Sequence, residues 1–477
     1  MSAKTVSRRQ VLRGAGLAIA GAGVAALAAC QPKVVEVERV VKETVVVTEE
    51  KIVKEAVEVE KEVTRVVEKQ VEAPTEPVEI LHLDRNIPQD LDFRRELAKR
   101  FEEMYPDIKV SVEVIPEGYA QTIQARIASG TAGDLFRHAT HWGMGNYALR
   151  GLLYQLDDFA DGDGYDLDVY FPGAIDANRF EGKLYALPVN GHPGWSGVYY
   201  QPELFAEAGI DEPTDEWTYD DMVAAAMAMT KDTTGDGRTD QYGLWVNHSY
   251  EATLTPISAF GGWPQDEAGT QATWDDPNTV AGLQWVYDCM NTWRISLQLP
   301  SFDSRVQLWS SGKVGMVLSG IWEGAYLGHE TPADKTMKLA TGPIGPSGER
   351  GGFVGVNNFP IWRSSQNPYE AWMWNRFLCS KEVGIEGVER IGEPGLRYDV
   401  WEDPVLANDP FVAPHYALLR SVKPMPEPAN GRLAELRQAV QPVIEGIVLM
   451  EITVEEGVAE IQQKSQNVLD MPKPGAG

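Results

Sequence analysis

The sequence lacks the short motifs that identify the commonest exported hydrolases and nucleotide-binding proteins. It has no His-Glu-x-x-His pair for zinc, and Gly194–Val198 lacks the final glycine of a Gly-x-Ser-x-Gly elbow. Gly312-Lys313 is followed by valine, so the Ser or Thr of a P-loop is missing. We therefore predict that the chain is not an enzyme.

Cysteine is scarce, with only 3 among 477 residues. Cys30 lies near the N-terminus, whereas Cys289 falls within the helical pattern Trp285–Trp293 and Cys379 lies at the end of the pattern that begins with Tyr369–Phe377. Two alternatives stay open for the last two cysteines: a single disulfide, or two buried free thiols.

Basic residues are outnumbered by acidic ones, and the net charge is −28. Residues 1–76 are balanced in charge, so the excess of carboxylates belongs to the remainder of the chain. This acidity argues against nucleic acid or an anionic membrane surface as a partner. No apolar run beyond Pro77 is long enough to span a membrane.

The N-terminus has the features of an export signal. Arg8-Arg9 precedes the uncharged, small-residue run Gly14–Ala29 and resembles a twin-arginine signal. Leu27–Cys30 resembles a lipobox, after which Cys30 would be lipidated and become the first mature residue. The competing interpretation is a plain signal peptide in which Cys30 has no role. The lipobox interpretation predicts a protein anchored by lipid to the outer face of a bacterial cell membrane.

Residues 31–76 form a Val-, Glu- and Lys-rich tether. Apolar residues such as Val34, Val37 and Val41 suit one face of a helix, but Val57–Glu60 alternates as a strand does. An amphipathic helix, a coiled coil and an extended tether all remain open. Ala73–Pro77 marks the start of the folded part.

From Pro77 onward the chain is longer than one core usually supports, which predicts two lobes. Strand and helix patterns alternate at Val78–Leu83, Asp90–Tyr105, Lys109–Ile115 and Tyr119–Ser129. This spacing predicts an α/β fold with a parallel sheet covered by helices. Ligands of such sheets bind at the carboxyl ends of the strands.

The stretch Gly182–Gly209 combines an extended segment, a glycine-rich loop and a helix from Pro202. The loop between them carries His192 and Trp195, which offer a stacking face and hydrogen bonds to a ligand. The alternative is an ordinary surface loop with one tryptophan packed beneath it.

The loop Asp232–Asp240 resembles the calcium loop of an EF-hand. Oxygen ligands fall at Asp232, Thr234, Asp236 and Asp240, and Arg238 would contribute its backbone carbonyl. The residue that would supply the twelfth-position carboxylate is a glycine. A structural Ca²⁺ completed from elsewhere and a solvated acidic turn are the two alternatives; no cofactor is required otherwise.

Four groups of residues, in order along the chain, resemble the family 1 extracellular solute-binding proteins, receptors of ABC importers that mostly take sugars. The groups are Gly182–Pro188; Tyr199–Phe205 with Ala208–Ile210; Ser311–Met316 with Gly320–Trp322; and Ser364–Pro368 with Ala371-Trp372 and Phe377–Glu382. The resemblance covers essentially all of residues 77–477.

The resemblance implies a periplasmic-binding-protein-like fold of two α/β lobes, an interlobe cleft and crossing hinge strands. The chain would cross near Val189-Asn190, Phe353–Asn358 and Gly395–Asp399. The lobes would comprise residues 77–189 with 359–395, and 190–358 with 396–477. The implied partners are a sugar or oligosaccharide, the membrane subunits of an importer and, through the lipid, the membrane.

A sugar cleft needs aromatic rings for stacking and polar side chains for hydroxyl groups. The resemblance places a stacking ring at Trp322, which we rank first. The candidate ligand-binding residues, taken at predicted strand ends and crossings, are Asp84, Arg85, Glu117, Trp142, Asn190, His192, Trp195, Glu251, Trp322 and Asn357. The late segment Lys423–Leu433 lacks the aromatic residue that the family often uses there.

A second function uses the same fold for a different ligand. Tryptophan rings and carboxylates could hold a cationic solute, such as a polyamine or quaternary amine, through cation–π contacts. The acidic composition permits this alternative to a sugar.

Overall fold

The computed structural model describes residues 40–46, 64–70, 77–298 and 301–475. The chain divides into two compact units, residues 1–75 and 76–477. In the first unit, β1 (Val40–Val46) and β2 (Thr64–Gln70) pair antiparallel, with Val40 opposite Gln70. The described part of the tether is this antiparallel pair, which is none of the three conformations left open. The predicted signal and Cys30 lie outside the described residues.

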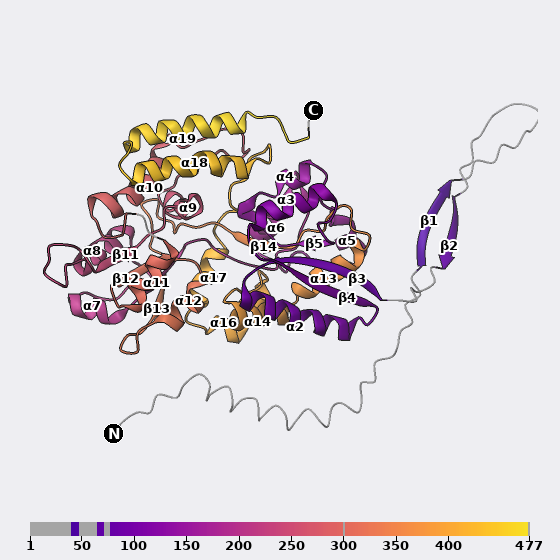
Figure 1. Cartoon of the computed structure of the whole chain (residues 1–477), viewed down its shortest axis with the longest axis horizontal. Coiled ribbons are helices and arrows are strands. Elements are labelled where there is room, and N and C mark those ends of the chain that lie inside the picture. The colour runs from indigo at the N-terminus through magenta and orange to yellow at the C-terminus, as the bar shows by residue number, and fades with distance from the viewer. Residues whose placement is uncertain (1–39, 47–63, 71–76, 299–300, 476–477) are drawn as a thin grey trace, which may run out of the picture. The chain divides into compact units, whose positions relative to one another are not determined.

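The second unit begins with a parallel sheet in the order β4-β3-β5 (Figure 1). Its strands are β3 (Val78–Arg85), β4 (Ile108–Ile115) and β5 (Leu135–Phe136), which α2 (Pro88–Met104) and α3 (Tyr119–Ser129) connect. The predicted strand and helix alternation is confirmed here. The carboxyl ends of these strands lead to the segments that carry Arg85, Gly118 and Arg137.

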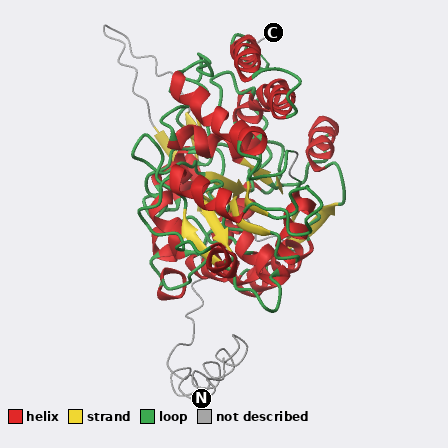
Figure 2. Ribbon diagram, turned by 90° about the vertical axis from the view of Figure 1, so that its left-hand side faces the viewer, coloured by secondary structure: helices red, strands yellow, loops and turns green. Residues whose placement is uncertain are grey.

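A second sheet has the order β11-β12-β10-β13. It contains β10 (Gly197–Tyr200), β11 (Tyr242–Trp245), β12 (Val314–Ser319) and β13 (Lys338–Thr341). β11 runs parallel to β12, whereas β10 runs antiparallel to both β12 and β13. Figure 2 shows strands enclosed by helices in this unit.

The chain crosses between the two sheets through a small third sheet, β6-β14-β9. β14 (Gly355–Asn358) pairs antiparallel with β6 (His138–Ala139) and with β9 (Asn190–His192). A third segment joins them where the Gly191 amide donates to the Pro394 carbonyl at 3.4 Å. These positions agree with the crossings that the resemblance implies.

Separate hydrophobic cores lie on the two sides of the crossing. The buried residues of one side come from 80–189 and 359–383, and those of the other side come from 198–327 and 425–469, together with Phe353. A further cluster around Ile321, Val354 and Leu396 lies at the crossing itself. The molecule therefore has two lobes, and their predicted boundaries stay a prediction.

Further helices and two short strands complete the fold. The remaining elements are η1 (Thr140–Trp142), α4 (Gly145–Leu149), α5 (Asp157–Gly162), α6 (Pro172–Asp176), β7 (Arg179–Phe180), β8 (Lys183–Leu184), α7 (Pro202–Ala208), α8 (Tyr219–Met229), α9 (Tyr250–Ala259), α10 (Pro277–Tyr287), the π-helix η2 (Asp288–Thr292), α11 (Phe302–Ser310), α12 (Glu323–Glu330), α13 (Pro368–Leu378), α14 (Lys381–Ile391), α15 (Tyr398–Trp401), α16 (Pro404–Ala407), α17 (Ala413–Leu419), α18 (Leu433–Val448) and α19 (Val454–Leu469).

Cys289 and Cys379 are free thiols, each buried in the core of a different lobe. Burial raises the pKa of Cys379 to about 12, so the thiol stays protonated at neutral pH. Of the two alternatives, the structure has two buried thiols and no disulfide between them. Within the described ranges, no helix is both long and apolar enough to cross a membrane.

Candidate functional site

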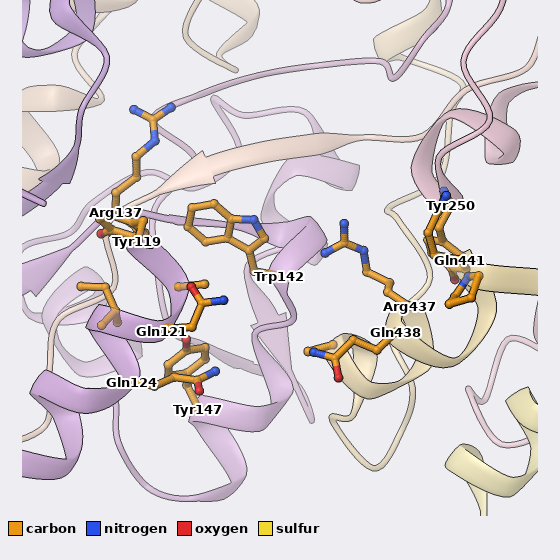
Figure 3. A pocket seen from close by; sticks show the side chains of 14 residues that line it. Tyr119, Gln121, Gln124, Arg137, Trp142, Tyr147, Tyr250, Arg437, Gln438 and Gln441 are labelled. Carbon is orange, nitrogen blue, oxygen red and sulfur yellow. Dashed lines mark hydrogen bonds between the residues drawn. The ribbon is translucent and has the colours of Figure 1, made fainter. Parts of the chain in front are cut away.

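A cavity of about 550 Å³ lies between the lobes (Figure 3). One wall comes from α3, the segment after β5, η1 and α4, and the other from α9 and α18. Its lining combines aromatic rings, four glutamines and two arginines. The lining residues are Tyr119, Ala120, Gln121, Ile123, Gln124, Arg137, Trp142, Tyr147, Tyr250, Ala434, Arg437, Gln438, Gln441 and Pro442.

The wall from the first lobe is aromatic. Trp142 on η1 lies with its ring centre 5.6 Å from that of Tyr119, at an interplanar angle of 35°. The Tyr119 hydroxyl donates to the Arg137 carbonyl at 2.8 Å, which fixes the ring at the start of α3. Gly118 precedes α3 with φ +58°, a conformation that favours glycine. The backbone therefore turns sharply at the end of β4 and places Tyr119 in the cavity.

The wall from the second lobe is polar. On α18, Arg437 donates to the His141 carbonyl at 3.0 Å and forms an ion pair with Glu251. Gln441 accepts a hydrogen bond from the Tyr250 amide at 2.7 Å. Figure 3 shows the Arg437 guanidinium extending toward Trp142. Arg437 and the amides can donate to ligand hydroxyl groups, while Trp142 offers a ring face.

Arg137 connects the cavity to a buried ionic cluster. Its Nη1 lies 2.8 Å from Asp90 and 3.6 Å from Asp84. Asp84 also lies 3.7 Å from Arg94, and all three of these side chains are almost fully buried. Although burial favours the neutral acid, His82 and the two arginines hold the pKa of Asp84 well below its usual range. The predicted ligand residue Asp84 thus holds Arg137 in place and does not line the cavity.

A second aromatic group lies at the crossing and comprises His192, Trp195, Trp322 and Phe353. The ring centre of Trp322 is 4.7 Å from that of His192 and 5.1 Å from that of Trp195, both edge to face. Burial lowers the pKa of His192 to about 4, so the ring is neutral. The structure brings these three predicted residues together, and none of them lines the cavity.

Glu323 orients the indole of Trp322. Its Oε1 accepts from the Trp322 Nε1 at 3.2 Å and from the Ser319 hydroxyl at 2.9 Å. The same oxygen lies 3.0 Å from Arg305. Burial raises the pKa of Glu323, an effect that the nearby guanidinium opposes.

Two further predicted residues meet where the crossing strands pair. Asn190 on β9 lies opposite Asn357 on β14, and the Asn357 amide donates to Glu393 at 2.8 Å. Burial raises the pKa of Glu393, while Arg137 and Arg85 act in the opposite direction. Asn190, Asn357 and Glu393 therefore place one polar side chain on each of the three crossings.

The remaining three predicted residues, Glu251, Arg85 and Glu117, do not line the cavity. Glu251 contacts a lining residue through its ion pair with Arg437. Arg85 is half-buried, and burial lowers its pKa. Glu117 is exposed and is not part of the lining. Of the ten predicted ligand residues, Trp142 alone lines the cavity described here.

Sequence reasoning missed the rest of the lining. Tyr119 lies two residues after the predicted ligand residue Glu117, at the same strand end. On α18 the apolar residues Leu436, Val440 and Ile444 face the core. Their spacing leaves Arg437 and Gln441 on another face of the helix. This polar face is the feature of the sequence that could have indicated the second cavity wall.

In the loop Asp232–Asp240, two of the predicted calcium ligands contact groups of the protein itself. Asp232 accepts backbone hydrogen bonds from Thr234, Gly235 and Gly237. Asp240, another predicted calcium ligand, forms an ion pair with the ammonium group of Lys313. In the described part of the chain, no cluster of three or more His, Cys, Asp or Glu side chains could hold a metal. The Ca²⁺ site therefore stays a prediction.

Comparison with known sequences identifies relatives along most of the folded unit. The family model described as bacterial extracellular solute-binding protein matches residues 87–385. A maltotriose-binding protein from Pyrococcus abyssi is 23% identical over 333 residues, which is 68% of this chain and 68% of that protein. An arabinooligosaccharide-binding protein from Halalkalibacterium halodurans is 26% identical over 256 residues, or 51% of this chain and 54% of the relative.

Solved structures share the architecture. An ABC substrate-binding protein from Listeria monocytogenes, in complex with cycloalternan, aligns with a TM-score of 0.71 and 19% identity, covering 83% of this chain and 99% of that chain. Maltose-bound MalE3 from T. maritima aligns with a TM-score of 0.69 and 20% identity, covering 82% of this chain and all of that chain. At these identities the likeness shows the fold, and it confirms the predicted two-lobe, cleft-containing architecture.

The family model spans more than half of the chain and includes β6, β9 and β14, the strands of the crossing. The cavity between the lobes lies where a solute would be enclosed. The chain belongs to the family of bacterial extracellular solute-binding proteins.

Proposed function

We propose that this protein captures a sugar or oligosaccharide in the cavity between its lobes and delivers it to the membrane subunits of an ABC importer. One observation carries the choice of ligand: the lining combines the rings of Trp142, Tyr119 and Tyr147 with glutamine amides. Rings cover the apolar faces of a sugar, and amides bind its hydroxyl groups. Two relatives named for binding maltotriose and arabinooligosaccharide support the same ligand class.

The cationic alternative has less support from the cavity. A cation needs carboxylates or an open aromatic cage to replace its water. Among the described residues, no Asp or Glu lines the cavity, and two arginines do. The nearby Glu251 is already paired with Arg437. The lining therefore offers no free carboxylate to a polyamine, and a neutral saccharide is favoured.

A thermal-shift panel separates the two ligand classes. The purified protein is heated with maltotriose, arabinotriose, spermidine or choline, each at several concentrations. A saccharide present at one hundred times its Kd stabilises the folded state by about 2.7 kcal/mol, equivalent to about 3 °C for a protein of this size. A shift with an amine and none with any saccharide would reject the proposed ligand.

We also propose that the bound saccharide is released unchanged. The chain belongs to a family of binding proteins, and the sequence lacks the hydrolase motifs sought above. After prolonged incubation, chromatography of the recovered saccharide should show no product. Turnover that copurifies with the protein would contradict a purely binding role.

Lipid attachment at Cys30 completes the proposal. The basis is sequence alone: Arg8-Arg9, the apolar run that follows, and Leu27–Cys30. A lipidated protein partitions into the detergent phase of a Triton X-114 extract, whereas Cys30→Ala should move to the aqueous phase. Identical partitioning of both proteins would remove the lipid anchor from the proposal.

A further inference from the structure

The loop that carries Trp142 is held on both sides by groups from the second lobe. On one side, Arg437 of α18 donates to the His141 carbonyl at 3.0 Å. On the other, the Glu427 carboxylate accepts from the Met144 amide at 3.1 Å and also from the Gly145 amide. The backbone is therefore fixed on either side of the indole.

Glu427 itself belongs to a segment anchored on the second lobe. Met425 packs in the core that contains α18 and α19. The Ala429 amide donates to the Gly269 carbonyl at 3.0 Å, and the Asn430 side chain donates to the Val468 carbonyl at 2.7 Å. Contacts from Glu427 to Met144 and Gly145 thus run from one lobe to the other.

The two segments approach each other through glycines. A Cβ on Gly145 would lie 2.7 Å from the Gly431 Cα and 2.8 Å from Glu427 Oε1. Gly431 has φ +69°, and a Cβ there would lie 2.6 Å from the Gly145 carbonyl carbon. No larger residue fits without moving backbone, so the close approach depends on both glycines. It brings the carboxylate within reach of two amides at once.

Those two amides begin α4, the helix that carries Tyr147. Met144 is the N-cap position of α4 and makes no capping hydrogen bond with its own side chain. The first amides of a helix lack partners within the helix, and a carboxylate is well suited to accept from them. Glu427 supplies this cap from the other lobe, and its removal would free the start of α4 together with the loop before it.

We propose that Glu427 is a positioning residue of the ligand cavity, which fixes Trp142 and Tyr147 in register with α18. Its carboxylate acts through the backbone of Met144 and Gly145, from which it accepts hydrogen bonds. The effect on affinity depends on the proposed function, because it requires that a saccharide binds against Trp142. The effect on the loop does not depend on any ligand.

The test compares Glu427→Ala and Glu427→Gln with the wild-type protein. Glutamine keeps one acceptor oxygen, so it should retain part of the contact, whereas alanine removes it. Glu435→Ala is the matched control: this carboxylate lies on the first turns of α18, pairs with Arg432 at 2.8 Å and does not line the cavity.

The first measurement is hydrogen–deuterium exchange without ligand. Peptides that cover residues 143–149 should exchange at least about tenfold faster in Glu427→Ala, because two hydrogen bonds to a carboxylate are lost. Glu427→Gln should lie between, and Glu435→Ala should match the wild type. Unchanged exchange in Glu427→Ala overturns the proposal. If alanine prevents folding, the glutamine variant decides by the same criterion.

The second measurement asks whether the indole moves. The Trp142 emission of each protein is obtained by subtracting the spectrum of its Trp142→Phe counterpart. Glu427→Ala should expose Trp142 and shift this difference spectrum to longer wavelength, and glutamine should restore it in part. Faster exchange with an unshifted spectrum would make Glu427 a helix cap only and would contradict its positioning role.

The third measurement uses maltotriose as the probe in calorimetric titrations. If the wild type binds it, Glu427→Ala should weaken binding about tenfold, since each tenfold change is about 1.4 kcal/mol. Equal affinities would overturn the positioning role. Failure of the wild type to bind counts against the proposed ligand, while the exchange and emission results still decide the role of Glu427.

Discussion

At the scale of single residues, the two arginines of the cavity are paired with carboxylates of the protein. Asp84 and Asp90 compensate Arg137, and Glu251 compensates Arg437. A buried ion pair contributes little net stability, but removal of one partner leaves the other charge uncompensated. The cavity consequently presents paired guanidinium groups, which act as hydrogen-bond donors more than as free positive charges.

Glu427 makes stability depend on pH in a defined direction. Burial raises its pKa from 4.5 to about 7, while the amides of Gly145 and Met144 lower it. The folded state therefore favours the neutral acid, and this contribution is present below pH 4.5 and lost as pH rises to about 7. Relative to Glu427→Gln, which cannot titrate, the wild type should lose up to about 3 kcal/mol across this range.

Chemical denaturation of both proteins at several pH values between 4.5 and 8 checks this prediction. Other carboxylates titrate in both proteins and cancel in the difference. The neighbouring His138 has a pKa of about 4 because it is buried, so it stays neutral over most of the range. A difference in unfolding free energy that is independent of pH would show that the Glu427 carboxyl is solvated.

At the scale of elements, the approach of α4 to the segment before α18 rests on the absence of a side chain at Gly145. An alanine Cβ there would meet Phe180 at 2.4 Å as well as Gly431 and Glu427. Gly145→Ala should destabilise the protein by about 1–3 kcal/mol, the usual cost of overpacking. Denaturant unfolding measures the change.

Gly162, at the end of α5, is the matched control for this substitution. A Cβ there has nothing within 4 Å. Gly162→Ala should therefore stay within about 0.5 kcal/mol of the wild type. Equal stability of the two variants would mean that α4 and the segment of Gly431 can separate without cost.

Elements with local signals were predictable from sequence. The start of α19 follows from Thr453, whose hydroxyl accepts from the Glu456 amide in a capping box. α3 lies between Gly118 and Gly130, both with positive φ. In contrast, β9 was assigned to a glycine-rich loop, because its strand partner β14 lies more than a hundred residues away in sequence.

The cavity lining also depends on contacts between segments that are distant in sequence. Trp142 was predicted because it follows a strand end, which is a local feature. Arg437 and Gln441 lie on a helix whose pattern already accounts for a core-facing side. Only the docking of α18 against η1, through contacts such as Arg437 to His141, places them opposite Trp142. That docking has no signature in the local sequence.

At the scale of the whole molecule, three crossings join lobes that have separate cores. Such an arrangement favours rotation of one lobe relative to the other about the crossing segments. Contacts from Glu427 and Arg437 to the loop of Trp142 span the lobes beside the cavity. We infer that ligand binding and lobe orientation are coupled through these contacts, because the same loop contributes to both.

The central claim is that a saccharide binds against Trp142 in the cavity between the lobes. The most direct measurement is calorimetric titration of one saccharide, chosen from the thermal-shift panel, into the wild type, Trp142→Ala and Trp293→Ala. Trp293 packs against the core of the second lobe and does not line the cavity, so it controls for loss of an indole. Trp142→Ala should weaken binding by about tenfold or more, and Trp293→Ala should bind as the wild type does. Wild-type affinity in Trp142→Ala would place the ligand elsewhere and contradict the claim.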